Sequence, residues 1–349
     1  MFTGWPFTDA QREARRRRGW RGLVGNTAGA GRRNRRPSAT RAYDVILGCL
    51  NQALPEGLAA AGGGMSGVIV VSAPDPRTGR DRVNVVGTID GGGGARRGVD
   101  GLDGSEVRYS QRSVPVEVIE IETVLVMRAL RLVPDSRRAG QFVSGAALEI
   151  EMENTSNRAV ITVRNLNRFV FAPWGFKGGE IGLLGKAVVN AGRSDERSVG
   201  KISVLELGQG DILTITSSTG GAFGEPLERD VAAIAREIEN GMLSPERAAD
   251  VYAVVFDRDG KIDQSATAER RRERGNRRSG DFNFCIERQR HDQVWSPQPR
   301  RQLASRALTY EQRIRSQLVD RVHHRLLAKG EGVDAEKLDQ VIAEEAGRL

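Results

Sequence analysis

Residues 147–153 read ALEIEME, residues 158–166 read RAVITVRNL and residues 211–218 read DILTITSS, and these three runs decide the fold. Each run is short, apolar and bounded by turn residues, which is typical of β-strands. Similar runs fill the region from residue 115 to residue 220, including residues 114–133, at spacings of about ten residues. The pattern predicts a β-rich body with an antiparallel sandwich or barrel-like core.

A helix and a hairpin are predicted ahead of this region. Residues 37–54 form a helical pattern, and its apolar stripe contains Tyr43, Ile46, Leu47, Leu50 and Leu54. Cys49 lies on the same side and is therefore expected to be a buried small side chain. Residues 67–73 (GVIVVSA) and 82–90 (RVNVVGTID) are joined by turn residues and predict a β-hairpin.

After residue 220 the sequence pattern becomes mainly helical. Two helices are predicted at residues 226–240 and 244–252, followed by a strand in VYAVVFDRDGKID (251–263) and two tail helices at 306–328 and 334–347. The fold class expected is therefore α+β, with helices flanking the β-rich body and a helical C-terminal tail. We divide the chain into an arm (1–36), the body (37–257), and a charged linker with the helical tail (258–349).

The net charge of +8 is concentrated at one end of the chain. Residues 1–40 hold ten arginines against Asp9 and Glu13, and this segment accounts for the whole excess. Residues 1–36 show no apolar period and predict an Arg-rich disordered arm. Because the rest of the chain is balanced in charge, nucleic acid is not the expected partner, although the arm leaves an anionic-surface or nucleic-acid binder as an alternative.

Several classes of protein do not fit the composition. No apolar run has the roughly 18–20 residues that cross a membrane, and residues 1–18 do not resemble a signal peptide, so a cytoplasmic protein is expected. Two cysteines, Cys49 and Cys285, cannot form a disulfide framework. The three histidines (His291, His323 and His324) all lie in the tail, so no histidine-based metal site or catalytic triad is predicted in the body.

Two glycine-rich loops are the candidate site. The first contains Gly92, Gly93 and Gly94 and leads to Asp100 and Asp103; the second contains Gly220 and Gly221 ahead of a predicted helix. Glycines let backbone N–H groups approach a substrate or an anion, and two nearby carboxylates suit general-base or metal-binding chemistry. Neither loop carries a nucleotide-binding fingerprint. Glycine and aspartate also form simple turns, which is the commoner explanation for such a pair.

Six segments taken together resemble one family. They occur in the family's order: PSATRAYDVILGCLNQALPEGLAAAGGG (37–64), GGGGARRGVDGLDG (91–104), LVPDSRRAGQ (132–141), FAPWGFKGG (171–179), LGQGDILTITSSTGGAFGEPLERD (207–230) and NGMLSPERAADVYAVV (240–255). Over roughly residues 36–256 the chain is similar to the C-terminal half of the hydantoinase B/5-oxoprolinase family, which includes caprolactamase-like enzymes and subunits of acetone and acetophenone carboxylases. The number and order of the motifs carry the resemblance.

The resemblance implies an ATP-dependent reaction in a hetero-oligomer. An A-type partner would bind ATP and phosphorylate a small cyclic amide, and the B-type part would supply the hydrolytic or carboxylating side. Two departures from the family are visible. The family's N-terminal half, which is associated with a divalent metal, has no counterpart here, so neither metal ligands nor catalytic residues can be assigned. Asp135-Ser136-Arg137-Arg138 also stands where relatives have Asp-Ser-Gly-Gly.

We therefore expect a B-type hydrolase subunit, or a fragment of one, that is inactive alone and acts on hydantoin, 5-oxoproline or a lactam with its A-type partner. A carboxylase-type subunit of the same family and a non-catalytic scaffolding subunit remain as alternatives. Asp100 and Asp103 are the candidate catalytic residues.

Overall fold

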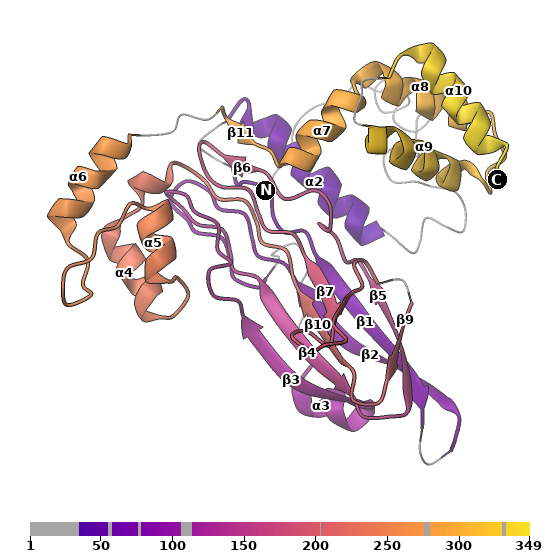
Figure 1. Ribbon diagram of the computed structural model, residues 1–349, viewed down its shortest axis with the longest axis horizontal. Coiled ribbons are helices and arrows are strands. Elements are labelled where there is room, and N and C mark those ends of the chain that lie inside the picture. Colours follow the sequence, from indigo (N-terminus) through magenta and orange to yellow (C-terminus); the bar gives the residue numbers. More distant parts are fainter. Residues whose placement is uncertain are drawn as a thin grey trace, which may run out of the picture. The chain divides into compact units, whose positions relative to one another are not determined.

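The computed structural model describes residues 35–54, 58–75, 78–105, 114–202, 204–275, 280–329 and 333–349 (Figure 1). The predicted arm, apart from its last two residues, lies outside these ranges. The chain divides into two compact units, Met1–Asn283 and Phe284–Leu349, and each is described by itself.

Two antiparallel sheets form the body of the first unit. One has the strand order β2-β1-β5-β9, with β1 (Ser66–Pro74), β2 (Asp81–Asp90), β5 (Arg158–Arg164) and β9 (Leu205–Gly208). The other has the order β3-β4-β10-β7-β8, with β3 (Leu125–Leu132), β4 (Leu148–Asn154), β7 (Lys186–Val189), β8 (Arg197–Ser198) and β10 (Ile212–Thr216). The predicted hairpin is confirmed, because β1 and β2 pair directly and Ser66 lies opposite Asp90.

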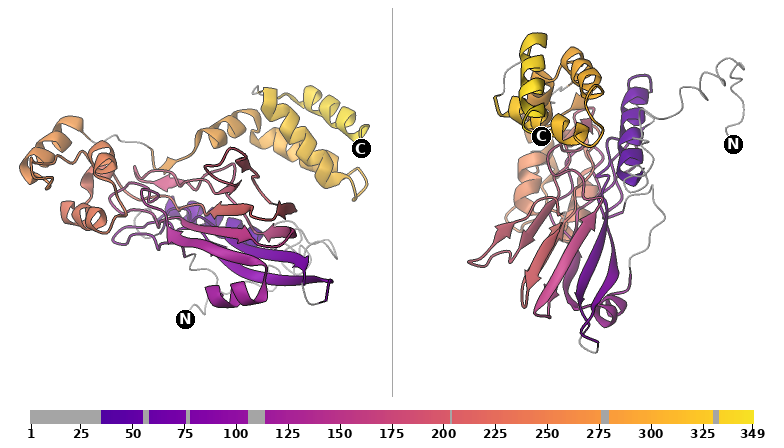
Figure 2. Two further views of the ribbon diagram at one scale, coloured as in Figure 1. Left: turned by 60° about the horizontal axis from the view of Figure 1, so that its bottom comes forward. Right: turned by 90° about the vertical axis from the view of Figure 1, so that its right-hand side faces the viewer.

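The two sheets share one hydrophobic core. Alternate residues of both sheets point inward, among them Ile69 and Ile161 from the first sheet and Met152 and Leu213 from the second. The outer face of β4 carries Glu149, Glu151 and Glu153 instead. Figure 2 shows the sheets as adjacent layers. The predicted α+β class with antiparallel sheets is therefore confirmed; the arrangement is an open sandwich, and no barrel closes among the described strands.

Two segments predicted as strand are not strands. Within residues 114–133, Val116–Glu122 is the helix α3, because the carbonyl of Pro115 accepts from the N–H groups of Val118 and Ile119 and starts a helical turn. The segment after α5 (Pro245–Val251) is also irregular, because α6 (Gln264–Arg274) supplies its hydrogen bonds. The Thr267 hydroxyl accepts from the Val255 N–H, and Arg271 donates to the Tyr252 carbonyl.

The predicted helices around the body are present with shorter bounds. A 3₁₀ turn, Pro226–Glu228, precedes α4 (Val231–Glu239), and the Ser244 hydroxyl caps α5 by accepting from the Arg247 N–H. The first helix described, α2 (Arg35–Asn51), contains the predicted stripe except for Leu54, which lies beyond its end. The two-residue strands β6 (Gly175–Phe176) and β11 (Phe282–Asn283) pair beside an aromatic cluster that contains Trp174 and Phe223.

The second unit has a hydrophobic core of its own. It contains α7 (Ile286–Val294), α8 (Pro297–Ala307), α9 (Arg315–Lys329) and α10 (Ala335–Ala346). The core includes the fully buried Trp295, Leu303 from α8, Leu318 and Leu326 from α9, and Leu338 from α10. The predicted tail helix at residues 334–347 is confirmed as α10, whereas the one predicted at residues 306–328 begins only at Arg315, because residues 308–314 form turns between α8 and α9.

Candidate functional site

The predicted glycine loops belong to one layer of backbone segments that lie side by side, which we call the glycine-rich layer. It consists of residues 60–64, 91–104, 139–147, 173–183 and 217–224, and in Figure 1 these segments run almost without helix or strand between the sandwich and α4 and α5. Hydrogen bonds between backbones join them. Gly92 donates to the Ser218 carbonyl (N···O 2.9 Å), Gly93 to Leu102 (2.8 Å), and Gly145 to Gly93 (2.9 Å).

Close approach between backbones explains why these positions are glycine. A Cβ atom on Gly145 would lie 1.8 Å from the Leu102 carbonyl oxygen, and one on Gly94 would lie 2.1 Å from that of Ala60. A Cβ atom on Gly220 would lie 2.2 Å from the Gly93 carbonyl oxygen, and none of these three glycines has a positive φ. At these three positions, glycine is therefore needed because a side chain would not fit, and not because of an unusual backbone conformation.

The predicted anion site depends on backbone N–H groups of the two glycine loops, and most of those described here already have hydrogen-bond acceptors. The N–H groups of Gly92, Gly93 and Gly221 already donate to backbone carbonyls, the last to Ala61 (2.8 Å). Amides engaged in this way are not aimed at a ligand, so the geometry favours a structural role for the loops. Anion or substrate binding by Gly92, Gly93, Gly94, Gly220 and Gly221 stays a prediction.

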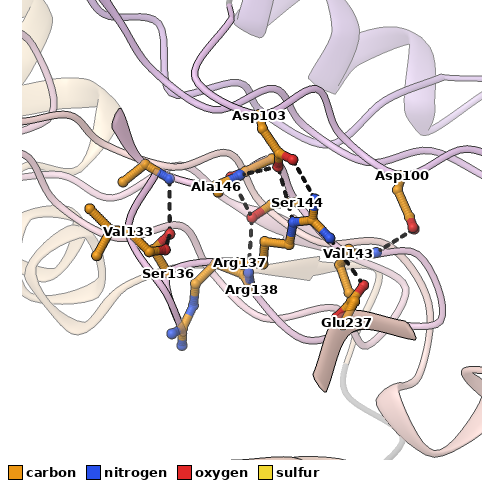
Figure 3. Close-up of polar contacts among 12 residues, drawn as sticks. Asp100, Asp103, Val133, Ser136, Arg137, Arg138, Val143, Ser144, Ala146 and Glu237 are labelled. Carbon is orange, nitrogen blue, oxygen red and sulfur yellow. Dashed lines mark hydrogen bonds and ion pairs between the residues drawn. The ribbon is translucent and has the colours of Figure 1, made fainter. Parts of the chain in front are cut away.

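The carboxylate of Asp100 links the first glycine loop to Val143 and to Arg229. One oxygen, Oδ1, accepts from the Val143 N–H (2.9 Å, Figure 3). The carboxylate also pairs with the guanidinium of Arg229, which reaches both oxygens at 3.1 Å and 2.9 Å. Arg229 is buried and donates in addition to the carbonyl of Gln141 (3.0 Å). Both oxygens of Asp100 therefore have strong donors.

Asp103 is held in the same way by a different arginine. Its Oδ1 accepts from the Ala146 N–H (2.7 Å) and from Arg137 Nε (3.0 Å), and its Oδ2 pairs with Arg137 Nη2 (Figure 3). Glu237, from α4, then joins the two pairs, because its Oε1 accepts from Arg229 (2.5 Å) and Arg137 (3.3 Å). We call these five charged side chains the carboxylate–arginine network.

Residues 135–138 make a further set of hydrogen bonds beside this network. Asp135 has a positive φ of 57°, and its carboxylate accepts from the Ser244 N–H at the start of α5 (2.8 Å). Ser136 donates to the Val133 carbonyl and accepts from the Ala147 N–H (2.9 Å). Arg138 donates to the Ile181 carbonyl (2.8 Å) and pairs with Glu180. Arg137 and Arg138 have φ values outside the positive range, and both contribute side-chain hydrogen bonds.

A separate cavity lies near the second glycine loop. It has a volume of about 380 Å³, and its lining includes Glu180, Glu225, Asp250 and Arg274. Burial, with a smaller contribution from Glu228, raises the pKa of Glu225 above its usual range. Sequence reasoning missed Glu225, and the available signal was its place directly after the second glycine loop. The other missed residues, Arg229 and Glu237, gave no local signal.

Metal binding finds no support among the residues the structure covers. They contain no group of three histidine, cysteine, aspartate or glutamate side chains that could hold an ion. Cys49, predicted to be buried, is exposed, because α2 turns its apolar side outward. Cys285 is buried in the second unit.

The body of the first unit is thus an open antiparallel sandwich with the glycine-rich layer at its end. The family described as Hydantoinase B/oxoprolinase matches residues 28–226, which is more than half of the chain. The chain therefore belongs to the Hydantoinase B/oxoprolinase family, and the matched segment contains both glycine loops, Asp100 and Asp103.

Curated relatives are similar over part of their length. The beta subunit of the caprolactamase of Pseudomonas jessenii is 26% identical over 234 residues, which is 64% of this chain and 40% of the relative. The B subunit of a putative D-/L-hydantoinase of Pseudomonas sp. (strain NS671) is 23% identical over 238 residues, 67% of this chain and 39% of the relative. The chain thus spans about two fifths of the length of these relatives.

Two solved structures share the fold. The ATP-dependent caprolactamase from Pseudomonas jessenii superimposes with a TM-score of 0.52 and 24% identity, over 64% of this chain and 40% of that one. Nucleotide-free acetone carboxylase gives a TM-score of 0.54 and 15% identity, over 84% of this chain and 42% of that one.

Of the helices in the described ranges, none has the length and apolar character to cross a membrane.

Proposed function

We propose that this chain is a B-type component of an ATP-dependent cyclic amide hydrolase and works with an A-type partner that binds ATP. The observation that carries the proposal is the family match over residues 28–226, together with likeness to two relatives named as caprolactamase and hydantoinase subunits. The substrate class is a small cyclic amide such as a hydantoin, 5-oxoproline or a lactam.

The chemistry explains why such a reaction needs a partner. An unstrained amide is a poor electrophile, and phosphorylation of its oxygen lets a positioned water attack the carbon. We assign ATP binding and phosphorylation to the A-type partner. A divalent metal in the assembly would need ligands beyond the described residues of this chain, since no suitable cluster occurs among them.

Within that assembly, we propose that the glycine-rich layer and its carboxylate–arginine network form a rigid frame. Asp100 and Asp103 each accept a backbone N–H and pair with an arginine, so proton transfer by either would require breaking these bonds. This supports the scaffolding alternative for this part of the protein over direct catalysis by Asp100 or Asp103.

Reconstitution tests the proposal. The chain is combined with an A-type subunit and with the part of a B-type subunit that lies outside the matched segment, and ATP-dependent hydrolysis of 5-oxoproline, hydantoin and caprolactam is measured for each protein alone and for the mixture. Turnover that requires this chain, its partners and ATP is expected, and activity of this chain alone would contradict the proposal. Asp100→Asn and Asp103→Asn then separate chemistry from framework: a large fall in turnover with assembly and stability intact would assign them a chemical role.

The carboxylase-type subunit is a second candidate. The fold likeness to acetone carboxylase covers 84% of this chain, against 64% for caprolactamase. Adding bicarbonate and a ketone such as acetone to the reconstituted mixture distinguishes the two. ATP-dependent consumption of the ketone, without hydrolysis of any cyclic amide, would favour the carboxylase.

A further inference from the structure

Helix α2 turns its polar side toward the protein. Thr40, Asp44, Leu47 and Asn51 are buried, and their spacing of four, three and four residues places them on one helical face. Asp44 accepts from Arg168 (2.7 Å), and the Asn51 side-chain amide donates to the Ala59 carbonyl (3.1 Å). Polar bonds therefore fix the helix to the body, and the only apolar member of that face is Leu47.

The opposite side of α2 is apolar and exposed. Val45 is 62% exposed, Ile46 56%, Leu50 43%, and Leu54, just beyond the helix, 57%. We call these four residues the α2 apolar face. The only charged residue from position 42 to position 54 is Asp44, which is buried. A surface helix normally has the reverse arrangement, with its apolar stripe toward the core.

The outer face of β4 provides a contrast within the same unit. There Glu153 pairs with Arg128 (2.5 Å), and Glu149 and Glu151 pair with Arg131. The protein thus places charged pairs where a strand faces water. The α2 apolar face has no such charges, which is typical of a surface covered by another polypeptide.

The area of the face argues against a second copy of the chain as its occupant. The helical residues 43–51 extend over about 14 Å at the helical rise, whereas a stable dimer buries about 800 Å² on each partner. A strip of this length supplies only part of such an interface. Val170 is also exposed, two residues after the Arg168 that pairs with Asp44, so a larger partner surface that also reaches Val170 fits better.

We propose that the α2 apolar face binds the part of a B-type subunit that lies outside the segment matched by this chain. The inference rests on family membership and on the B-type assignment above. The relatives contain about three fifths of their length beyond the match, and α2 lies within the family segment that starts at residue 28. The partner surface must be uncharged and apolar, because the face offers no charged group to pair with it.

Co-purification tests the contact. This chain, tagged, is co-expressed with the part of the Pseudomonas jessenii caprolactamase beta subunit outside its matched 234 residues. The relative's own matched segment, tagged in the same way, serves as the positive control. A one-to-one complex is expected by size-exclusion chromatography with light scattering. Ile46→Glu and Leu50→Glu should each weaken it by about tenfold or more, because they place a charge in an apolar contact.

Ile121→Glu on α3 is the matched control, since Ile121 is an isoleucine on a helix and is 78% exposed. Its complex should match that of the unmodified chain, and all variants should keep the same thermal midpoint. The proposal is overturned if the α2 variants bind like the control, or if only the relative's own segment forms a complex. It is also overturned if the chain alone is a dimer that Ile46→Glu makes monomeric. The measurement uses no ATP or substrate, so it fails independently of the proposed activity.

Discussion

Arg137 and Arg229 each hold two carboxylates, and their positions explain much of the framework. Arg137 binds Asp103 and Glu237, and Arg229 binds Asp100 and the same Glu237. The network therefore links the first glycine loop to α4 through side chains, with backbone bonds to residues 143 and 146 beside them. Removing one member leaves a partly buried charge without its partner, which costs more than the bond itself contributes.

Asp103→Asn should lower the free energy of unfolding by about 1–3 kcal/mol, because it weakens the pair with Arg137 and the bond from the Ala146 N–H. Urea denaturation measures the change. Asp259→Asn, in an exposed turn, is the control and should change stability by less than about 0.5 kcal/mol. Equal stability of the two variants would show that the network contributes nothing measurable.

At the scale of elements, the sequence patterns correctly predicted helices and strands whose hydrogen-bond partners lie close to them along the chain. The hairpin of β1 and β2, and the cap and first-turn proline of α5, follow from local residue order. The strand predicted at Val254 and Val255 failed because α6 satisfies the backbone there. The side that α2 buries also escaped prediction, since periodicity locates a stripe but not the surface that covers it.

The candidate site was predictable only in part for the same reason. The sequence located the glycine loops and Asp100 and Asp103, because the residue types are unusual where they stand. Their partners are distant: Arg229 follows Asp100 by 129 residues, and Glu237 follows Arg137 by 100. No local pattern encodes such a pair.

The glycine-rich layer gives a prediction at the same scale. Gly145→Ala should lower the free energy of unfolding by about 3 kcal/mol or more, or prevent folding, because its Cβ would lie 1.8 Å from a carbonyl oxygen. Gly280→Ala is the matched control, since its Cβ would meet no atom within 4 Å. Thermal and urea unfolding compare the two. Similar stability of both variants would mean that the backbones can separate at little cost.

For the molecule as a whole, two compact units, each with a hydrophobic core, predict two unfolding events. The first core lies between the sheets, and the second includes Trp295 and the residues around it. In the second unit, burial lowers the pKa of His323 below its ordinary value of 6.5, and the nearby His291 lowers it further, against the opposing effect of Asp320. The His323 ring also packs against Trp295, with centroids 4.2 Å apart.

The unfolded chain therefore binds a proton at His323 more readily than the folded unit does, and stability falls as the pH drops below 6.5. The thermal transition of the second unit, followed by differential scanning calorimetry, should move to lower temperature between pH 7.5 and pH 5. His323→Gln should reduce this shift, whereas His324→Gln, at an exposed position, should change it much less, because His324 makes only a small contribution to the lowered pKa of His323. A shift that persists in full in His323→Gln would contradict the assignment.

The glycine-rich layer also has a consequence for what solution methods detect. Its segments carry little regular secondary structure, so far-ultraviolet circular dichroism would underestimate how much of the chain is ordered. Hydrogen–deuterium exchange measures a different property, namely how often the hydrogen bond of a backbone N–H group opens and exposes it to solvent. The amides of Gly92, Gly93 and Gly145 donate to backbone carbonyls inside the layer and should exchange as slowly as those of the central strands. By this measure, a region that a ribbon drawing renders as loop would rank among the most protected parts of the protein.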